Sequence, residues 1–226
     1  HFGQSEAGIV TESSRIVYRG GTGEITEKKS RFIADIRPVS TEEEALAFIE
    51  EIRKKYWDAR HHCYAYILGE RGQQSRCSDD GEPSQTAGRP MLDVLTGEGL
   101  TDVCAVVTRY FGGTLLGTGG LVRAYSGAVK EGLSQCVLME KRPGRELAVT
   151  AGYGDVGKVQ YLAAQAGIET LDTVYEADVR FSFLVSLEEE GGFVKKLTEG
   201  TAGRAKIQPG DQVFYGMGPD GLVVFR

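Results

Sequence analysis

The feature that most constrains the fold of this chain is the placement of its glycines. The 226 residues include 31 glycines, many of them between Gly72 and Gly132. The densest run, 112–120, follows a β-branched stretch at 103–110 that predicts a buried strand, and precedes a segment at 121–137 with helical apolar spacing. Glycine permits positive φ and close backbone approach. The run therefore predicts a tight strand-to-helix corner, and contact of its backbone N–H groups with an anionic ligand is an equally open interpretation.

Composition and charge exclude several classes of protein. Lys and Arg number 26 against 32 Asp and Glu, so the formal net charge is −6. This acidic balance disfavours a general nucleic-acid coat, although a local basic patch remains compatible with it. No apolar stretch approaches the roughly 18 residues of a membrane helix, and no secretory signal opens the sequence. The four cysteines form no CxxC pair, so we expect reduced thiols, a cytoplasmic location and no membrane partner.

The order of the expected elements predicts two α+β domains, at 1–140 and 144–226, with the boundary at a composition shift around 141–144. The opening residues 1–5 lack an initiator Met, and we interpret them as foreign to the natural chain. In the first domain we expect strands at 16–18, 23–27, 32–36, 63–68 and 103–110, helices at 42–57, 90–96 and 121–137, and a polar loop at 69–89. Thr41 and Glu44 have the spacing of a helix capping box. These elements predict a mixed or antiparallel sheet with helices on one face.

The second domain has a different order of strands and helices. Strands are expected at 146–152, 169–176, 178–187, 205–207 and 213–215, with helices at 156–166 and 189–198. The first six of these elements have the β-α-β-β-α-β order of the ferredoxin-like fold.

An acidic loop at 78–90 is the second candidate for chemistry. Asp79, Asp80 and Glu82 lie within four residues, and clustered carboxylates suit a hard cation. The same loop also suits an anion site, in which Ser84, Thr86 and Arg89 hold the ligand near a helix start. Asp-Gly and Glu-Pro are common turn makers, so a solvated turn with side-chain caps is the interpretation that the spacing favours.

Two adjacent histidines precede the strand at 63–68. Side chains of neighbouring strand residues point to opposite faces, so His61 and His62 cannot ligate one metal ion together. His61 is a weak candidate for a general base, and a hydrogen-bonded core histidine is the more common situation. The sequence has no G-x-S-x-G nucleophile elbow.

Several motifs resemble those of the IMPACT/YigZ family. They are Lys29-Ser30-Arg31-Phe32-Ile33-Ala34, Ala59-Arg60-His61-His62-Cys63-Tyr64-Ala65-Tyr66, the acidic loop 78–90, Arg109-Tyr110-Phe111-Gly112-Gly113, and Leu116-Gly117-Thr118-Gly119-Gly120-Leu121-Val122-Arg123-Ala124-Tyr125. The resemblance covers residues 23–137 in order. The remainder is similar to the small C-terminal domain of bacterial YigZ-type members, which has been likened to a domain of elongation factor G.

The resemblance implies a fold and a role. The expected N-terminal domain is an α/β sandwich like the second domain of a small-subunit ribosomal protein, with a left-handed βαβ crossover. The expected role is translation regulation. The sequence departs from the family at Gln85, where a small residue is usual, and at Leu115, where Lys is frequent. The second departure removes a cation from the glycine-rich run.

We therefore expect a translation regulator that binds RNA, the ribosome or a translation-associated partner through a cleft formed by the two loops. Arg89, Arg109 and Arg123 are expected to meet phosphates. The candidate binding residues are Asp79, Asp80, Glu82, Ser84, Thr86, Arg89, Arg109, Tyr110, Gly112, Gly113, Gly117, Gly119, Gly120 and Arg123. No cofactor is expected, and the sequence does not fix the oligomeric state.

Two alternatives stay open. One is a metal-dependent hydrolase for a small phosphorylated or peptide substrate, in which Asp79, Asp80 and Glu82 hold the cation and His61 is the base. The other is a protein-docking module.

Overall fold

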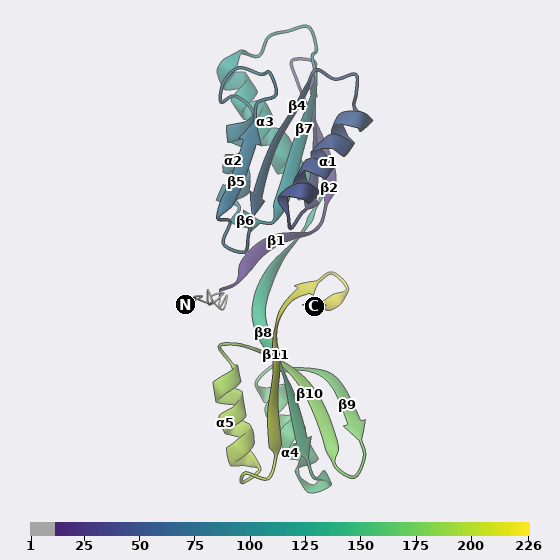
Figure 1. Cartoon of the computed structure of the whole chain (residues 1–226), viewed down its shortest axis with the longest axis vertical. Helices are drawn as coiled ribbons and strands as arrows, with labels where there is room; N and C mark the ends of the chain where they lie inside the picture. Colours follow the sequence, from purple (N-terminus) through teal and green to yellow (C-terminus); the bar gives the residue numbers. More distant parts are fainter. Residues whose placement is uncertain (1–11) are drawn as a thin grey trace, which may run out of the picture. The chain divides into compact units, whose positions relative to one another are not determined.

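The computed structural model describes residues 12–226, and the opening residues 1–5 lie outside this range. The described chain divides into two compact units, Ser14–Glu140 and Lys141–Arg226 (Figure 1). Each unit combines helices with a β-sheet, so the α+β class predicted from the sequence is confirmed. Across residues 12–226, every helix is too short or too polar to cross a lipid bilayer.

The first unit is built on a five-stranded sheet with the order β2-β3-β7-β4-β5, and every neighbouring pair is antiparallel. The five strands are β2 (Gly21–Glu27), β3 (Ser30–Pro38), β4 (His61–Leu68), β5 (Gln74–Ser78) and β7 (Val103–Tyr110). Two short strands outside this sheet, β1 (Ser14–Arg19) and β6 (Leu100–Thr101), pair in parallel. Strand β5 replaces part of the loop that the sequence predicted at 69–89.

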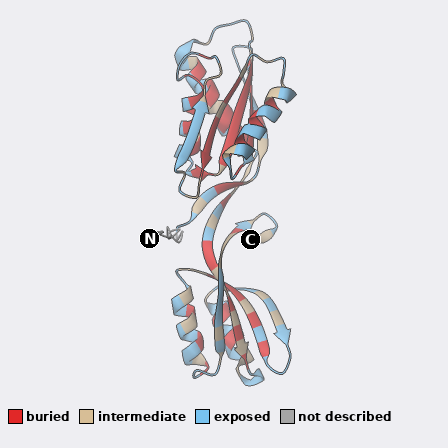
Figure 2. Ribbon diagram, viewed as in Figure 1, coloured by how far each residue is buried: buried red, intermediate tan, exposed pale blue. Residues whose placement is uncertain are grey.

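Helices cover both faces of this sheet, so the prediction of helices on one face was wrong. Helix α1 (Glu42–Lys55) connects β3 to β4 and packs on one face against Tyr66 and Leu68. Helices α2 (Gly88–Gly97) and α3 (Gly117–Ser134) pack on the other face against Ala65 and Ile67. The alternation along β4 shows the reason, because between Cys63 and Leu68 both sets of alternating side chains are apolar and, apart from the half-buried Tyr64, buried (Figure 2).

The starts of α1 and α3 differ in chemistry. The Thr41 hydroxyl accepts from the Glu44 backbone N–H at 3.2 Å, which confirms the predicted cap of α1. The Glu44 carboxylate in turn accepts from the backbone N–H of Ser40 at 2.8 Å. Helix α3 begins at Gly117, earlier than the predicted start at 121, and its N-cap residue Leu116 provides no side-chain hydrogen bond.

The second unit has the ferredoxin-like order that the sequence predicted. Its elements are β8 (Val137–Ala151), a short 3-10 turn η1 (Tyr153–Asp155), α4 (Val156–Gln165), β9 (Glu169–Tyr175), β10 (Val179–Ser186), α5 (Glu190–Gly200), β11 (Lys206–Gly218) and β12 (Gly221–Phe225). The antiparallel order β9-β10-β8-β11 places the first strand of the unit between the third and the fourth. Phe181 and Phe183 on β10 pack with Phe193 of α5 in its core. Strand β12, which the sequence did not predict, pairs with the end of β11.

Candidate functional site

The acidic loop after β5 is held by its first carboxylate. The Asp79 side chain accepts from the backbone N–H groups of Gln85, Ala87 and Gly88, at 2.9, 3.1 and 2.9 Å. These groups precede or open α2, whose N-cap residue Ala87 has no capping side chain. Asp79 therefore caps the N-terminus of α2, although it does not stand at the N-cap position. The turn interpretation of this loop predicted such side-chain caps.

The second acidic residue fixes the two histidines at the start of β4. The Asp80 carboxylate accepts from the His62 backbone N–H at 2.7 Å, and the Asp80 carbonyl lies 2.8 Å from His61 Nδ1. A carbonyl oxygen only accepts, so His61 Nδ1 is the protonated nitrogen. The His62 ring lies against the Tyr56 carbonyl instead, 2.7 Å from Nε2. The two rings therefore face opposite sides of the sheet, as expected.

Glu82 lies at the centre of a buried polar network. Its carboxylate accepts from Arg109 Nη1 at 2.8 and 2.9 Å and from the Tyr125 hydroxyl at 2.6 Å. His61 Nε2 lies 3.4 Å from the same carboxylate. Arg109 Nη2 also reaches the Ser30 hydroxyl at 3.4 Å. The network joins β3, β4, β7, α3 and the acidic loop, and it balances a buried guanidinium with a buried carboxylate.

The three carboxylates of the loop do not converge on a common point. Asp79 faces backbone N–H groups, Asp80 faces the start of β4, and Glu82 faces Arg109. Within residues 12–226 there is no group of three metal-ligating side chains. The structure thus does not bring Asp79, Asp80 and Glu82 together as the cation site on which the hydrolase alternative was based. The nearby Cys63 offers no replacement nucleophile, because burial raises the pKa of its thiol.

A cleft of about 470 Å³ opens in front of the network, and we call it the Phe111 cleft. Its lining includes Arg60, His61, Glu82, Arg109, Phe111, Leu115 and the first residues of α3. Phe111 is 51% exposed and Leu115 is 80% exposed. The guanidinium carbon of Arg109 lies 5.6 Å from the centre of the Phe111 ring. The cleft thus combines an aromatic face, an aliphatic side chain and cationic groups.

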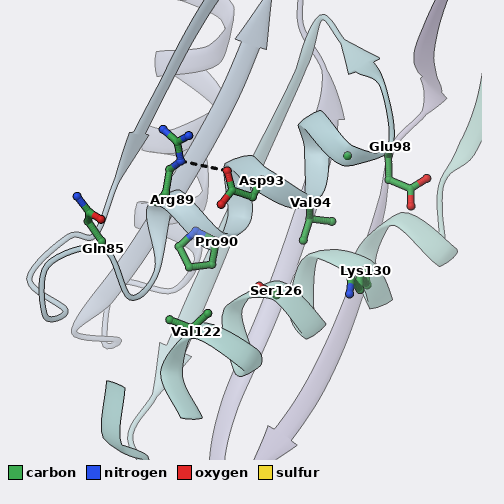
Figure 3. Close-up of a pocket in the computed structure, with 10 residues that line it drawn as sticks. Gln85, Arg89, Pro90, Asp93, Val94, Glu98, Val122, Ser126 and Lys130 are labelled. Carbon is green, nitrogen blue, oxygen red and sulfur yellow. Dashed lines mark hydrogen bonds and ion pairs between the residues drawn. The ribbon is translucent and has the colours of Figure 1, made fainter. Parts of the chain in front are cut away.

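The structure does not bring the three predicted phosphate-binding arginines together. Arg109 lies in the Phe111 cleft but is bound to Glu82. Arg89 is exposed, pairs with Asp93 at 3.0 Å, and lines a separate pocket between α2 and α3 (Figure 3). Arg123 is exposed on α3 and lies beside Gly119.

The other predicted residues have local structural roles. Thr86 is buried and donates to the Pro83 carbonyl at 2.6 Å, while Ser84 is exposed. The Tyr110 hydroxyl donates to Asp58 at 2.7 Å, and burial together with this carboxylate raises the pKa of Tyr110 to about 12. Gly113 and Gly120 lie in the corner beside the cleft, but they are not among the residues that line it.

Two glycines of the corner have a structural reason that needs no ligand. A Cβ at Gly112 would overlap the backbone of Lys29, so the two segments approach as only glycine allows. Gly117 has a φ of +74°, a conformation that other residues adopt at a cost.

The sequence analysis missed four residues of this site. The Phe111 cleft is lined by Arg60, Phe111 and Leu115. The fourth residue, Tyr125, donates a hydrogen bond to Glu82, which also lines the cleft. Phe111 and Arg60 stand inside recognised motifs, but only the structure shows that both are accessible on one cleft. Tyr125 fits an apolar core position of a helix, and nothing in the sequence pairs its hydroxyl with Glu82.

Comparisons with known proteins match a family model to a part of each unit. Residues 28–133 match the Impact N-terminal domain, and residues 149–204 match a domain of unknown function, DUF1949. The chain is 42% identical to "IMPACT family member YvyE" of Bacillus subtilis, over 88% of this chain and 91% of that protein. It is 39% identical to "IMPACT family member YigZ" of Escherichia coli, over 80% and 89% respectively.

One solved structure, described only as a hypothetical protein, has a TM-score of 0.57 and 38% identity, over 88% of this chain and 97% of that chain. "Protein IMPACT-A" of Xenopus tropicalis is 34% identical over 51% of this chain and 36% of its own length. The chain belongs to the IMPACT family.

Proposed function

We propose that this protein is a translation regulator that binds single-stranded RNA of the translation machinery through the Phe111 cleft. The observation that carries the proposal is the pairing of a half-exposed aromatic ring, Phe111, with an accessible guanidinium, Arg60, on one cleft. Stacking of bases on aromatic rings, beside cations that meet the backbone phosphates, is the usual way in which proteins hold single strands. Family membership supports the translation context.

The local charge supports the proposal although the chain as a whole is acidic. Two arginines and one glutamate line the cleft. Glu82 is already bound to Arg109, whereas Arg60 is exposed and has no ion-pair partner among residues 12–226. The cleft therefore carries a positive excess on a protein of net charge −6. Such a local excess attracts a polyanion to this place and disfavours binding elsewhere on the surface.

The direct test is fluorescence anisotropy of a 3′-labelled single-stranded RNA titrated with the full chain. We expect Phe111→Ala to weaken binding about tenfold or more, because loss of stacking costs about 1–3 kcal/mol per base. Tyr161→Ala is the matched control, since Tyr161 is also an exposed aromatic residue with a cation over its ring. Equal losses in both variants would refute the role of Phe111.

Arg60 provides a second arm of this experiment. Arg60→Gln removes one phosphate contact and should lower the slope of log affinity against log salt by about one. Arg71→Gln is its control, because Arg71 is exposed beyond the far end of β4 and does not line the cleft. An unchanged slope for Arg60→Gln would contradict the phosphate contact.

Sedimentation of the protein with cell lysate through a sucrose gradient tests the translation context. We expect the protein to migrate with ribosomal particles at low salt, to leave them as the salt concentration rises, and to leave them after nuclease treatment. Co-migration that withstands nuclease would instead support docking to a protein partner, and a protein that stays at the top of the gradient at every salt would refute ribosome binding.

A further inference from the structure

We infer that the RNA held by the Phe111 cleft continues along the end of the first sheet, so that a second base stacks on Trp57 and phosphates meet Lys28 and Lys29. The ligand is then an extended single strand of several nucleotides rather than one nucleotide. This inference rests on the proposed function, because it names the further surface that the same strand contacts, and the two can fail separately in the experiment below.

The segments that carry these residues meet at one end of the sheet. The turn between β2 and β3 consists of residues 28–29, β7 ends at Tyr110, and β4 begins at His61. Tyr110 pairs with Arg31 of β3, and the preceding residue of β7, Arg109, pairs with His61, so the three strand ends are level. Neighbouring strands lie about 4.8 Å apart, so the row from β3 through β7 to β4 spans about 10 Å.

The two lysines of the β2–β3 turn lie against the segment that carries Phe111. A Cβ at Gly112 would overlap the Lys29 backbone, and the Gly112 N–H donates to the Ser30 hydroxyl at 3.1 Å. Lys28 and Lys29 are exposed, and neither has an ion-pair partner among residues 12–226. Two unpaired cations therefore border Phe111 on the side of β3.

On the side of β4, the turn between α1 and β4 presents Trp57. This residue is the single tryptophan of the chain, and it is 80% exposed. Its neighbours are anchored, because the Tyr56 ring packs edge-on against the Tyr110 ring and Asp58 accepts from the Tyr110 hydroxyl at 2.7 Å. Arg60 lines the Phe111 cleft three residues further on. Since three residues of chain reach at most about 11 Å, a few nucleotides of an extended strand can bridge Trp57 and the cleft.

The charge of this sheet end favours RNA as the occupant. One exposed apolar side chain by itself needs no ligand, but Trp57 follows two exposed lysines in the last turn of α1. Residues 27–29 and 54–60 together contain five cations and two carboxylates, an excess of three positive charges on a chain of net charge −6. The cations are Lys28, Lys29, Lys54, Lys55 and Arg60, and the carboxylates are Glu27 and Asp58. Exposed aromatic rings among cations are what stacked bases and their phosphates require.

Tryptophan fluorescence of the full chain tests the inference directly, because Trp57 is its single tryptophan. Unlabelled oligouridylates of two, four and eight nucleotides are the probes. We expect a base stacked on the indole to quench the emission, and the octanucleotide to bind at least tenfold more tightly than the dinucleotide. By fluorescence anisotropy of a labelled octanucleotide, Trp57→Ala should weaken binding about tenfold or more, whereas Trp57→Phe, which keeps a ring, should weaken it less than about threefold. Trp57 is exposed, so both variants should fold.

The double variant Lys28→Gln/Lys29→Gln tests the phosphate contacts. It should lower the slope of log affinity against log salt by about 1.4, because each phosphate contact to a single strand contributes about 0.7. Lys195→Gln/Lys196→Gln is the matched control, since it removes two adjacent exposed lysines from α5 of the second unit. Equal slopes in the two double variants would overturn the inference.

The remaining outcomes separate this inference from the proposed function. RNA binding that depends on Phe111, with unchanged tryptophan fluorescence and an unaffected Trp57→Ala variant, leaves the proposed function intact and overturns the inference. RNA binding that depends on neither aromatic ring refutes both. If Trp57→Ala retains RNA binding but loses nuclease-resistant co-migration with ribosomal particles, the Trp57 surface docks a protein, and the inference is again overturned.

Discussion

Removal of one charge from the buried pair of Glu82 and Arg109 should strongly destabilise the first unit, and Glu82→Gln is the substitution that tests this. The two side chains are 4% and 7% exposed and meet at 2.8 Å. Removal of the Glu82 charge leaves the Arg109 guanidinium buried without a counterion. It also replaces one carboxylate oxygen, which accepts from Arg109 and from Tyr125, with an amide donor.

The expected cost follows from this geometry. Breaking a buried ion pair from one side typically costs about 3–5 kcal/mol, and domains have about 5–15 kcal/mol of stability in total. Arg109→Met, which leaves the Glu82 carboxylate buried with Tyr125 and His61, should cost a similar amount. Since the double variant buries neither charge, its cost should be smaller than the sum of the two single costs by at least about 2 kcal/mol.

Amide hydrogen exchange, followed by mass spectrometry, measures the change in the free energy of unfolding separately for each unit. Urea unfolding of the same samples provides a second measurement of that change. Peptides from β4 and β7 report on the first unit, and peptides from β9 and β10 provide a comparison within the same molecule. Single variants within about 1 kcal/mol of the parent protein would refute the reasoning. Costs that add within about 0.5 kcal/mol would also refute it, because independent sites behave in that way.

Three further predictions concern single positions. Gly112→Ala should cost at least about 2 kcal/mol of stability, because a Cβ there overlaps the Lys29 backbone. Gly97→Ala in helix α2, where the space around a Cβ is open, should be neutral or stabilising, and thermal unfolding compares the two variants. Thr41→Ala should cost about 1 kcal/mol by loss of the α1 cap, measured by urea unfolding. Burial raises the pKa of Asp35, so the folded parent protein binds a proton there more tightly than the unfolded chain does. Asp35 should therefore contribute less to stability as pH rises through that pKa, so the urea midpoint of Asp35→Asn relative to that of the parent protein should rise from pH 4 to pH 7.

The fold was predictable from the sequence where local signals and burial agree. The cap at Thr41, the apolar spacing of α1 and the β-α-β-β-α-β order of the second unit all have local causes. Strand β5 was missed because Gln74–Ser78 is polar and exposed at the edge of the sheet, so it has no alternating pattern. Helix α3 begins inside the glycine run because its later turns pack on the sheet, which outweighs the low helix propensity of glycine.

The candidate site was less accessible to sequence reasoning. The loops were found, but the partners of their side chains depend on contacts between distant segments. Glu82 and Arg109 stand 27 residues apart and Glu82 and Tyr125 stand 43 apart, and no local pattern links them. The sequence therefore suggested a cation site for a carboxylate that the fold uses to neutralise an arginine. The exposure of Phe111 and Leu115 likewise depends on the tertiary contacts of the corner after β7, where Gly112 packs against the Lys29 backbone.

The internal use of every carboxylate in the acidic loop has an evolutionary consequence. Asp79, Asp80 and Glu82 each satisfy groups on a different neighbouring segment, so none can be exchanged alone without leaving a buried or capping group unsatisfied. Substitutions in this loop should therefore be accepted in concert, with Glu82 and Arg109 changing together or not at all. Leu115, in contrast, is exposed at the edge of the Phe111 cleft, and its replacement leaves no such group unsatisfied. Exposed positions beside the Phe111 cleft can thus diverge freely in related proteins, while the carboxylates of the acidic loop should change only together with their partners.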